Sequence, residues 1–357
     1  MNLRGRLLRS VALLMFVSMA LPACPQAARK VTKLADGVYA IEHGDRQDGF
    51  ASGNTMVIVG SRQVFVVDSG FMPSDARQDI GQIRQWTDKP VSFVLNTHFH
   101  NDHNFGNRAY LDAFPAVTII AHAETKRDMA MFGPGSAERV ERSTATLQKM
   151  LDTGKTKDGR TLTAEEITEI KNALSSRAAA MGEIRQVKFQ GATLAFDHDF
   201  SIDLGEREVQ VKFLGRGNTS GDAVVYLPRE KIAAAGDLIV HPIPYAYDGY
   251  PSEWVRTLEN LDRLDAETIV PGHGPVMHDK VYLHLVHDLM KSAVDQLNAR
   301  LIEVGPAVGR TLDDVKDSID LSPFRQRFAG DDKDLAAEFD DMAASLIKVA
   351  FAEASLR

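Results

Sequence analysis

The sequence predicts an α/β fold in which two β-sheets pack face to face with helices on their outer faces. A strand–turn–strand–acid pattern over Asn54–Asp68 recurs over Asp222–Asp237, and helical periodicity follows each β-rich segment. A chain of 357 residues, 44% of them hydrophobic, has enough apolar material for the layers of such a sandwich.

The first half of the chain predicts short strands with a helix between them. Apolar runs bounded by turn residues indicate the strands, and the spacing of Ile80, Ile83 and Trp86 indicates the helix. The expected elements are a first strand over Val31–Ile41, a hairpin over Asn54–Gly70, a helix over Ser74–Trp86, and strands over Val91–Asn96 and Val117–Ala121.

Residues from about 134 to 183 predict a helical insertion between the two β-rich halves. The capping box Thr163–Glu166 opens its second helix. The insertion either packs over a sheet or walls an active site. After the second β-rich half the chain becomes helical, most clearly over Tyr282–Val304 and Asp334–Ala354.

The N-terminus reads as a signal peptide over residues 1–23, with cleavage expected between 20 and 28. Three arginines, Arg4, Arg6 and Arg9, precede the apolar run Val11–Ala20, which is too short to span a membrane. We therefore expect a periplasmic or secreted protein. Leu21–Cys24 is similar to a bacterial lipobox, so a lipoprotein attached through Cys24 is the alternative. Because Cys24 is the sole cysteine, the folded body would have neither a disulfide nor a thiolate metal ligand.

The composition favours a small-molecule substrate over a polyanionic partner. The formal net charge is −8 and no basic stripe is present, which argues against nucleic acid. Apart from the lipidation alternative, nothing indicates membrane attachment, and the sequence does not define an oligomeric state.

The run Thr97–His103, which reads THFHNDH, directly follows an apolar strand and predicts a metal centre. His98 and His100 are two residues apart and project the same way on an extended chain. Asp102 and His103 follow on a turn and can face a second ion, because one tetrahedral ion cannot take all four side chains and a water. The alternative is a solvated polar strand end.

Three later segments place polar groups at the ends of apolar strands, where rigid scaffolds usually hold reacting groups. They are the turn Gly217-Asn218-Thr219, the pair Gly236-Asp237 and the turn Gly272-His273-Gly274. With Val67-Asp68-Ser69-Gly70 and the histidine run, they resemble the motifs of the metallo-β-lactamase superfamily across Val31–Met277. The resemblance implies an αββα sandwich over 31–278 with a two-metal site at one edge, leaving 279–357 as a C-terminal helical region.

Carried over by motif, the resemblance implies two zinc ions. His98 and His100 would serve the first; Asp102, His103 and His273 would serve the second, with Asp237 bridging. Asn218 stands where the family has a histidine, and an amide oxygen is a weaker zinc ligand than imidazole. We therefore expect one tight and one weak zinc, with His241 as an alternative ligand. Asp68 is expected to support the loop by hydrogen bonding, and Asp222 and Thr219 to hold a turn.

The function implied is hydrolysis of an ester, lactone or amide-type carbonyl by metal-activated water. Asp102 would orient the nucleophile or receive its proton, and Asn218, without the first metal, would hydrogen-bond the oxyanion or the water. A genuine β-lactamase is one alternative: export and the lack of a cysteine ligand favour it, whereas a bridging Asp237 favours lactonase- or esterase-like members. A non-catalytic periplasmic metal-binding protein is the other. The aromatic stretch from Tyr245 to Trp254 is either a substrate wall or loop packing.

Overall fold

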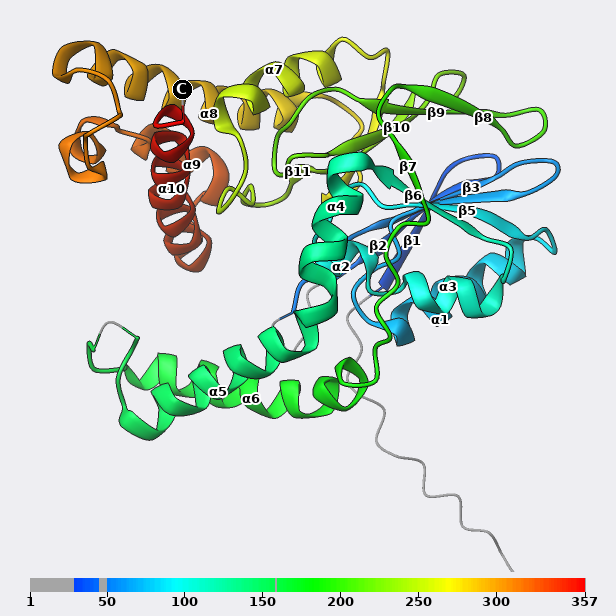
Figure 1. The fold of residues 1–357 in the computed structure, drawn as a ribbon, viewed down its shortest axis with the longest axis horizontal. Coiled ribbons are helices and arrows are strands. Elements are labelled where there is room, and N and C mark those ends of the chain that lie inside the picture. The colour runs from blue at the N-terminus through cyan, green and yellow to red at the C-terminus, as the bar shows by residue number, and fades with distance from the viewer. Residues whose placement is uncertain (1–28, 45–49, 158, 357) are drawn as a thin grey trace, which may run out of the picture.

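The computed structural model describes residues 29–44, 50–157 and 159–356 and has two β-sheets packed face to face (Figure 1). The expected signal peptide and Cys24 lie outside these residues. The seven-stranded sheet runs in chain order through β1 (Arg29–Ala35), β2 (Val38–His43), β3 (Thr55–Val59), β4 (Val64–Val67), β5 (Val91–Leu95), β6 (Thr118–His122) and β7 (Leu194–Phe196). The five-stranded sheet has the order β12 (Thr268–His273), β11 (Ile232–Val240), β10 (Ala223–Leu227), β9 (Glu208–Phe213) and β8 (Phe200–Asp203).

Alternation along the strands builds the core between the sheets. On β3, Met56 and Ile58 face the other sheet and Val57 faces outward, as a two-residue period requires. On β10, Val225 packs in this central core whereas Val224 belongs to the outer core. Because both faces of the central strands are covered, these strands are mostly apolar.

Helices cover the outer face of each sheet, which completes the αββα sandwich. Helices α1 (Pro73–Trp86) and α3 (Asn107–Ala113) bury Ile80, Ile83 and Tyr110 against the seven-stranded sheet. Helices α7 (Pro251–Asp262), α8 (Val281–Val304) and α10 (Lys333–Ala354) cover the five-stranded sheet with side chains such as Trp254 and Leu289.

Two sets of helices extend beyond the sandwich. Helices α5 (Ser136–Thr153) and α6 (Ala164–Ile184) follow α4 (Ala123–Phe132) and the 3-10 turn Gly133–Gly135, and project as a pair (Figure 1). The Thr163–Glu166 capping box opens α6, as its sequence predicts. At the C-terminus, 3-10 turns at Leu312–Asp314 and Lys316–Ser318 and helix α9 (Ser322–Ala329) connect α8 to α10.

The structure corrects the sequence prediction in one place and adds to it in another. The expected single strand over Val31–Ile41 is a hairpin, because Gly37 takes a left-handed φ of 70° and turns the chain between β1 and β2. Strands β7 to β9 were not predicted, since β7 has only three residues and β8 is mostly exposed. Among the described helices, none is long and apolar enough to cross a membrane.

Candidate metal centre

Segments from both sheets converge on one edge of the sandwich and bring all six predicted ligands together. The histidine run leaves β5 and enters the short helix α2 (Asn101–Asn104), while β11 contributes Asp237 and β12 ends at His273. The side chains form two groups, each with ligand atoms within 4.8 Å of one another. The groups are His98, His100 and Asp237, and Asp102, His103 and His273.

In the first group, His98 Nε2 lies 3.0 Å from His100 Nδ1 and 3.5 Å from Asp237 Oδ2. In the second, His273 Nε2 lies 3.0 Å from Asp102 Oδ2 and 3.2 Å from His103 Nε2. Asp237 Oδ1 is 3.2 Å from His103 Nε2, so the Asp237 carboxylate lies between the two groups. The geometry therefore matches a shared, bridging acid.

Asp68 at the end of β4 fixes which nitrogen of two histidines carries the proton. Its Oδ1 accepts a hydrogen bond from Thr97 N, and its Oδ2 accepts from Thr97 Oγ1 and lies 2.8 Å from His103 Nδ1. A carboxylate can only accept, so His103 carries its proton on Nδ1. The Thr97 hydroxyl has already donated to Asp68, so it accepts from His98 Nδ1, 3.0 Å away. When neutral, as a bound cation requires, His98 and His103 would therefore both present Nε2 as a lone pair.

These lone pairs and carboxylate oxygens face one another in a buried site, an arrangement that a cation would stabilise. His98 and His103 are fully buried and Asp237 is 3% exposed. Among the described residues, Asp237 Oδ1 has no hydrogen-bond partner, although two imidazoles surround it. Buried acceptors without donors are costly unless paired or bound to a metal. The donor set, imidazole and carboxylate with no thiolate, suits zinc.

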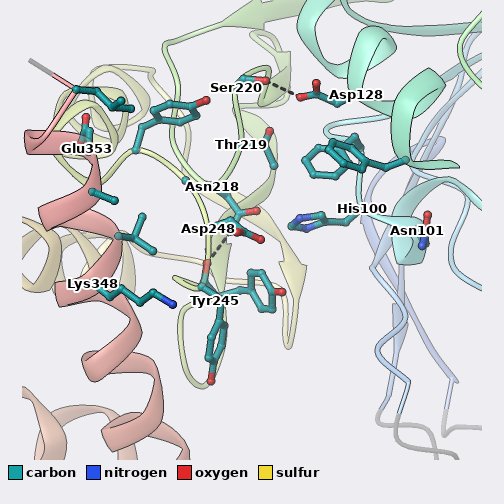
Figure 2. A pocket seen from close by; sticks show the side chains of 18 of the residues that line it. His100, Asn101, Asp128, Asn218, Thr219, Ser220, Tyr245, Asp248, Lys348 and Glu353 are labelled. Atoms are coloured by element: carbon teal, nitrogen blue, oxygen red, sulfur yellow. Dashed lines mark hydrogen bonds between the residues drawn. The ribbon is translucent and has the colours of Figure 1, made fainter. Parts of the chain in front are cut away.

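Asn218 lies in the same cavity as His100 with its amide held in one orientation. Its Nδ2 donates to the carbonyl oxygen of Tyr245 at 2.6 Å, so Oδ1 points the other way. That Oδ1 is buried and without a hydrogen-bond partner among the described residues. Figure 2 shows the Asn218 side chain directed across the cavity toward the His100 ring. The arrangement favours Asn218 as an acceptor or metal ligand over a donor to an oxyanion.

Burial and mutual attraction shift the pKa values of the metal-free site in opposite directions. Burial, with the neighbouring His98, lowers the pKa of His100 to about 3. Burial also opposes protonation of His103, but Asp237 and the other nearby carboxylates outweigh it and hold the pKa of His103 well above its usual value. Burial would raise the pKa of Asp237, yet the surrounding imidazoles hold it well below its usual value. The carboxylate thus stays charged and attracts cations.

Two glycines allow the ligands to pack closely. A Cβ built on Gly53 would lie 2.3 Å from the His103 ring, and one on Gly272 would lie 1.9 Å from Asp237 Oδ1. Buried amides hold the loop from beneath: Asn96 donates to the carbonyl oxygen of His103, and Asn107 donates to Asn96. The metal loop is therefore pre-organised.

Other sequence candidates lie outside the two groups. His241 packs on the Tyr282 ring, 4.9 Å between centroids, and is not in either ligand group. His122 caps α4 and stacks on Phe213. Asp222 accepts hydrogen bonds from Gly217 N, Thr219 N and Thr219 Oγ1, which is the turn-holding role expected of it.

A cavity of about 670 Å³ opens onto the ligands and a second of about 770 Å³ adjoins it, with His100, Asn101, Tyr245 and Tyr247 common to both. Val140 of α5 lines the inner cavity, so the insertion does wall the site. No sequence pattern predicts the C-terminal wall of the cavities. It consists of Leu335 and Glu338 in the inner cavity and Lys348, Val349, Ala352, Glu353 and Leu356 in the outer cavity. The sequence analysis also missed the role of the Thr97 hydroxyl, which hydrogen-bonds both Asp68 and His98. Its place beside His98 in the sequence could have suggested that role.

Comparison with known proteins identifies the family of this arrangement. A family model described as the metallo-beta-lactamase superfamily matches residues 48–273. The type 2 metallo-beta-lactamase of Bacillus sp. (strain 170) is 31% identical over 97 residues, 26% of this chain and 37% of that protein. The type 2 metallo-beta-lactamase of Elizabethkingia meningoseptica is 22% identical over 251 residues, 68% of this chain and 78% of that one.

A linear primary-alkylsulfatase of Pseudomonas sp. (strain ATCC 19151) is 20% identical over 278 residues, 73% of this chain and 48% of that protein. The chain thus spans less than half the length of the Bacillus and Pseudomonas relatives. Among solved structures, the DIM-1 metallo-beta-lactamase has a TM-score of 0.51 at 18% identity, covering 75% of this chain and 99% of its own. The FIM-1 enzyme of Pseudomonas aeruginosa, in a mono-zinc form, also has a TM-score of 0.51 at 18% identity, covering 75% and 97%. These structural matches show the fold.

Proposed function

Because the chain belongs to the metallo-beta-lactamase superfamily of metal-dependent hydrolases, we propose that it hydrolyses an ester, lactone or amide-type carbonyl at a two-zinc centre. One observation carries the proposal. Six imidazole and carboxylate side chains converge in two groups, with the lone pairs of His98 and His103 turned inward by Asp68 and Thr97.

His98, His100 and Asn218 would hold the first cation, and Asp102, His103 and His273 the second, with Asp237 shared. Bound divalent cations in such a pair lower the pKa of water and polarise the substrate carbonyl. Side chains of the protein would orient the attacking water and accept its proton. Asp102 lines the inner cavity with its carboxylate 3.0 Å from His273 Nε2, so its oxygens can orient the attacking water or accept its proton.

We further propose that the two sites have unequal affinity for zinc. Asn218 offers a neutral amide oxygen where an imidazole would complete the first site, and amides bind zinc more weakly. The second site has two imidazoles and the Asp102 carboxylate in addition to Asp237. The second site would therefore fill first.

The names of the relatives and the position of Asp237 support particular substrate classes. The names of the Bacillus and Elizabethkingia relatives support including β-lactams, and that of the Pseudomonas relative supports including alkyl sulfates. Asp237 lies between the two groups, and the resemblance associates a bridging acid with lactonase- and esterase-like members, which supports esters and lactones.

Zinc-loaded protein should hydrolyse at least one of three carbonyl probes, a chromogenic cephalosporin, a γ-lactone or an aryl ester. Turnover of a fourth probe alone, a linear alkyl sulfate, would reject the carbonyl substrate in favour of a sulfate ester. Chelation should abolish turnover and zinc should restore it, because the attacking water depends on the metal. The His273→Ala variant, purified in the same way, controls for contaminating hydrolases. Tight zinc binding without turnover of any probe would reject the hydrolase in favour of a non-catalytic metal-binding protein.

A further inference from the structure

The outer cavity is placed to hold the part of a substrate that does not react. It has a volume of about 770 Å³ and meets the inner cavity at His100 and Tyr245. A molecule with its scissile bond at the ligand groups can therefore extend into the outer cavity without crossing the protein.

Aromatic side chains line much of this cavity. The Tyr245 ring meets the His100 ring edge-on at 5.4 Å between centroids, and the Tyr247 ring lies 5.0 Å from that of Tyr245. These two tyrosines are 39% and 41% exposed, which is high for rings beside a metal site. Phe99 and Phe132 form another pair, 5.4 Å apart. Such rings favour an apolar chain or ring in the substrate.

The cations and acids of the outer cavity are mostly committed to other partners. Asp128 accepts a hydrogen bond from Ser220, and Glu353 accepts hydrogen bonds from Ser252. Arg139 donates to Phe132 O and Ser136 Oγ. Asp248 is exposed, and Figure 2 draws it at the Asn218 end of the cavity.

Lys348 is different from these groups. It is exposed on α10, lines the outer cavity, and extends from the helix toward the loop of Tyr245 (Figure 2). No carboxylate of the described residues lies within 4.0 Å of its ammonium group, although the chain is acidic overall. An unpaired ammonium on the wall of an aromatic cavity is suited to a carboxylate or similar anion.

We propose that Lys348 is a specificity-determining residue that binds an anionic group on the part of the substrate remote from the scissile bond, while the apolar part packs on Tyr245 and Tyr247. The substrate would therefore be an ester, lactone or amide with an apolar arm ending in an anion. The inference rests on the proposed function. Lys348 lies beyond the residues that the family model matches, 48–273, so this recognition belongs to the C-terminal extension.

Paired aryl esters test the inference through kinetics. The 4-nitrophenyl monoesters of adipic and suberic acid are compared with 4-nitrophenyl hexanoate and octanoate, which replace the free carboxylate with a methyl group. Wild type should prefer the acid ester at one or both lengths. Lys348→Met should raise KM for the acid ester about three- to tenfold, Lys348→Glu should raise it further, and kcat and the neutral esters should be unchanged. Lys333→Met, on the same helix outside both cavities, should match wild type.

Binding to zinc-free protein gives a readout that does not depend on turnover. By calorimetry, 4-phenylbutyrate should bind wild type more tightly than 4-phenylbutan-1-ol, and Lys348→Glu should lose that difference. Equal binding of acid and alcohol by wild type, or an acid preference that survives in both Lys348 variants, would overturn the inference. An equal loss of affinity for the neutral and the acid ligand in the Lys348 variants would also overturn the inference, because it would indicate a structural role for Lys348. If wild type binds the acid selectively but hydrolyses no probe, the proposed function fails and the anion site stands.

Discussion

Asp237→Asn is expected to lower kcat/KM by at least about three powers of ten, equivalent to about 4 kcal/mol of transition-state stabilisation. The Asp237 carboxylate lies between the two ligand groups, with Oδ2 3.5 Å from His98 Nε2 and Oδ1 3.2 Å from His103 Nε2. An amide of the same shape removes the negative charge that offsets two divalent cations, so zinc content should fall together with activity.

Steady-state kinetics and elemental analysis of the purified variant check this expectation. Gly272→Ala is the complementary variant: it keeps every ligand but adds a Cβ 1.9 Å from Asp237 Oδ1, and should reduce activity by displacing the carboxylate. Asp203→Asn, at the exposed end of β8, is the control for an acid-to-amide change. Wild-type zinc content and activity in Asp237→Asn would show that Asp237 does not bridge.

Asp68→Asn is expected to weaken zinc binding by about 10- to 100-fold, although it replaces none of the six proposed ligand side chains. Asn tolerates the left-handed φ of 58° that Asp68 adopts, so the backbone should be retained. With the amide oxygen kept on Thr97 N, the amide group would face Thr97 Oγ1 and His103 Nδ1. Its donors would move the His103 proton to Nε2, and the Thr97 hydroxyl would turn to His98 Nδ1 and do the same there.

Competition with a chromophoric chelator measures the zinc affinity, and circular dichroism checks the fold. Asp79→Asn is the matched control, since Asp79 is equally buried and contacts an imidazole, that of His43, outside the ligand groups. Zinc affinity in Asp79→Asn should match wild type. An unchanged affinity in Asp68→Asn would mean that Asp68 does not set the proton positions of His98 and His103.

The sequence was sufficient to predict which side chains meet in the two groups because most of them lie in short segments at strand ends. The run from His98 to His103 supplies four of them within six residues, and His273 is the last residue of β12. Asp237 is expected at a strand end but lies within β11, where the pairing register with β12 shifts after Gly236. A sandwich of two sheets brings such ends to one edge, so element order alone implies that they meet. The supporting role of Asp68 was implied by the resemblance to the superfamily, and its hydrogen bonds to Thr97 and His103 are consistent with it.

Features that depend on distant packing were not predictable in this way. The orientation of the Asn218 amide is set by the Tyr245 carbonyl, a backbone group 27 residues away. The outer wall of the cavity comes from α10, whose sequence reads only as an amphipathic helix. Which face of α10 meets the site depends on how α7 and α8 pack beneath it, and no local pattern encodes that.

The number and affinity of zinc ions bound by metal-free protein test the account most directly. In a calorimetric titration, wild type should bind one zinc tightly and a second about 10- to 100-fold more weakly, because Asn218 offers an amide oxygen to the first site. Asn218→His should bring the second affinity close to the first. Two equally tight sites in wild type, or an unchanged titration in Asn218→His, would contradict the proposal of two sites with unequal affinity. A failure of wild type to bind zinc stoichiometrically would contradict the metal centre itself.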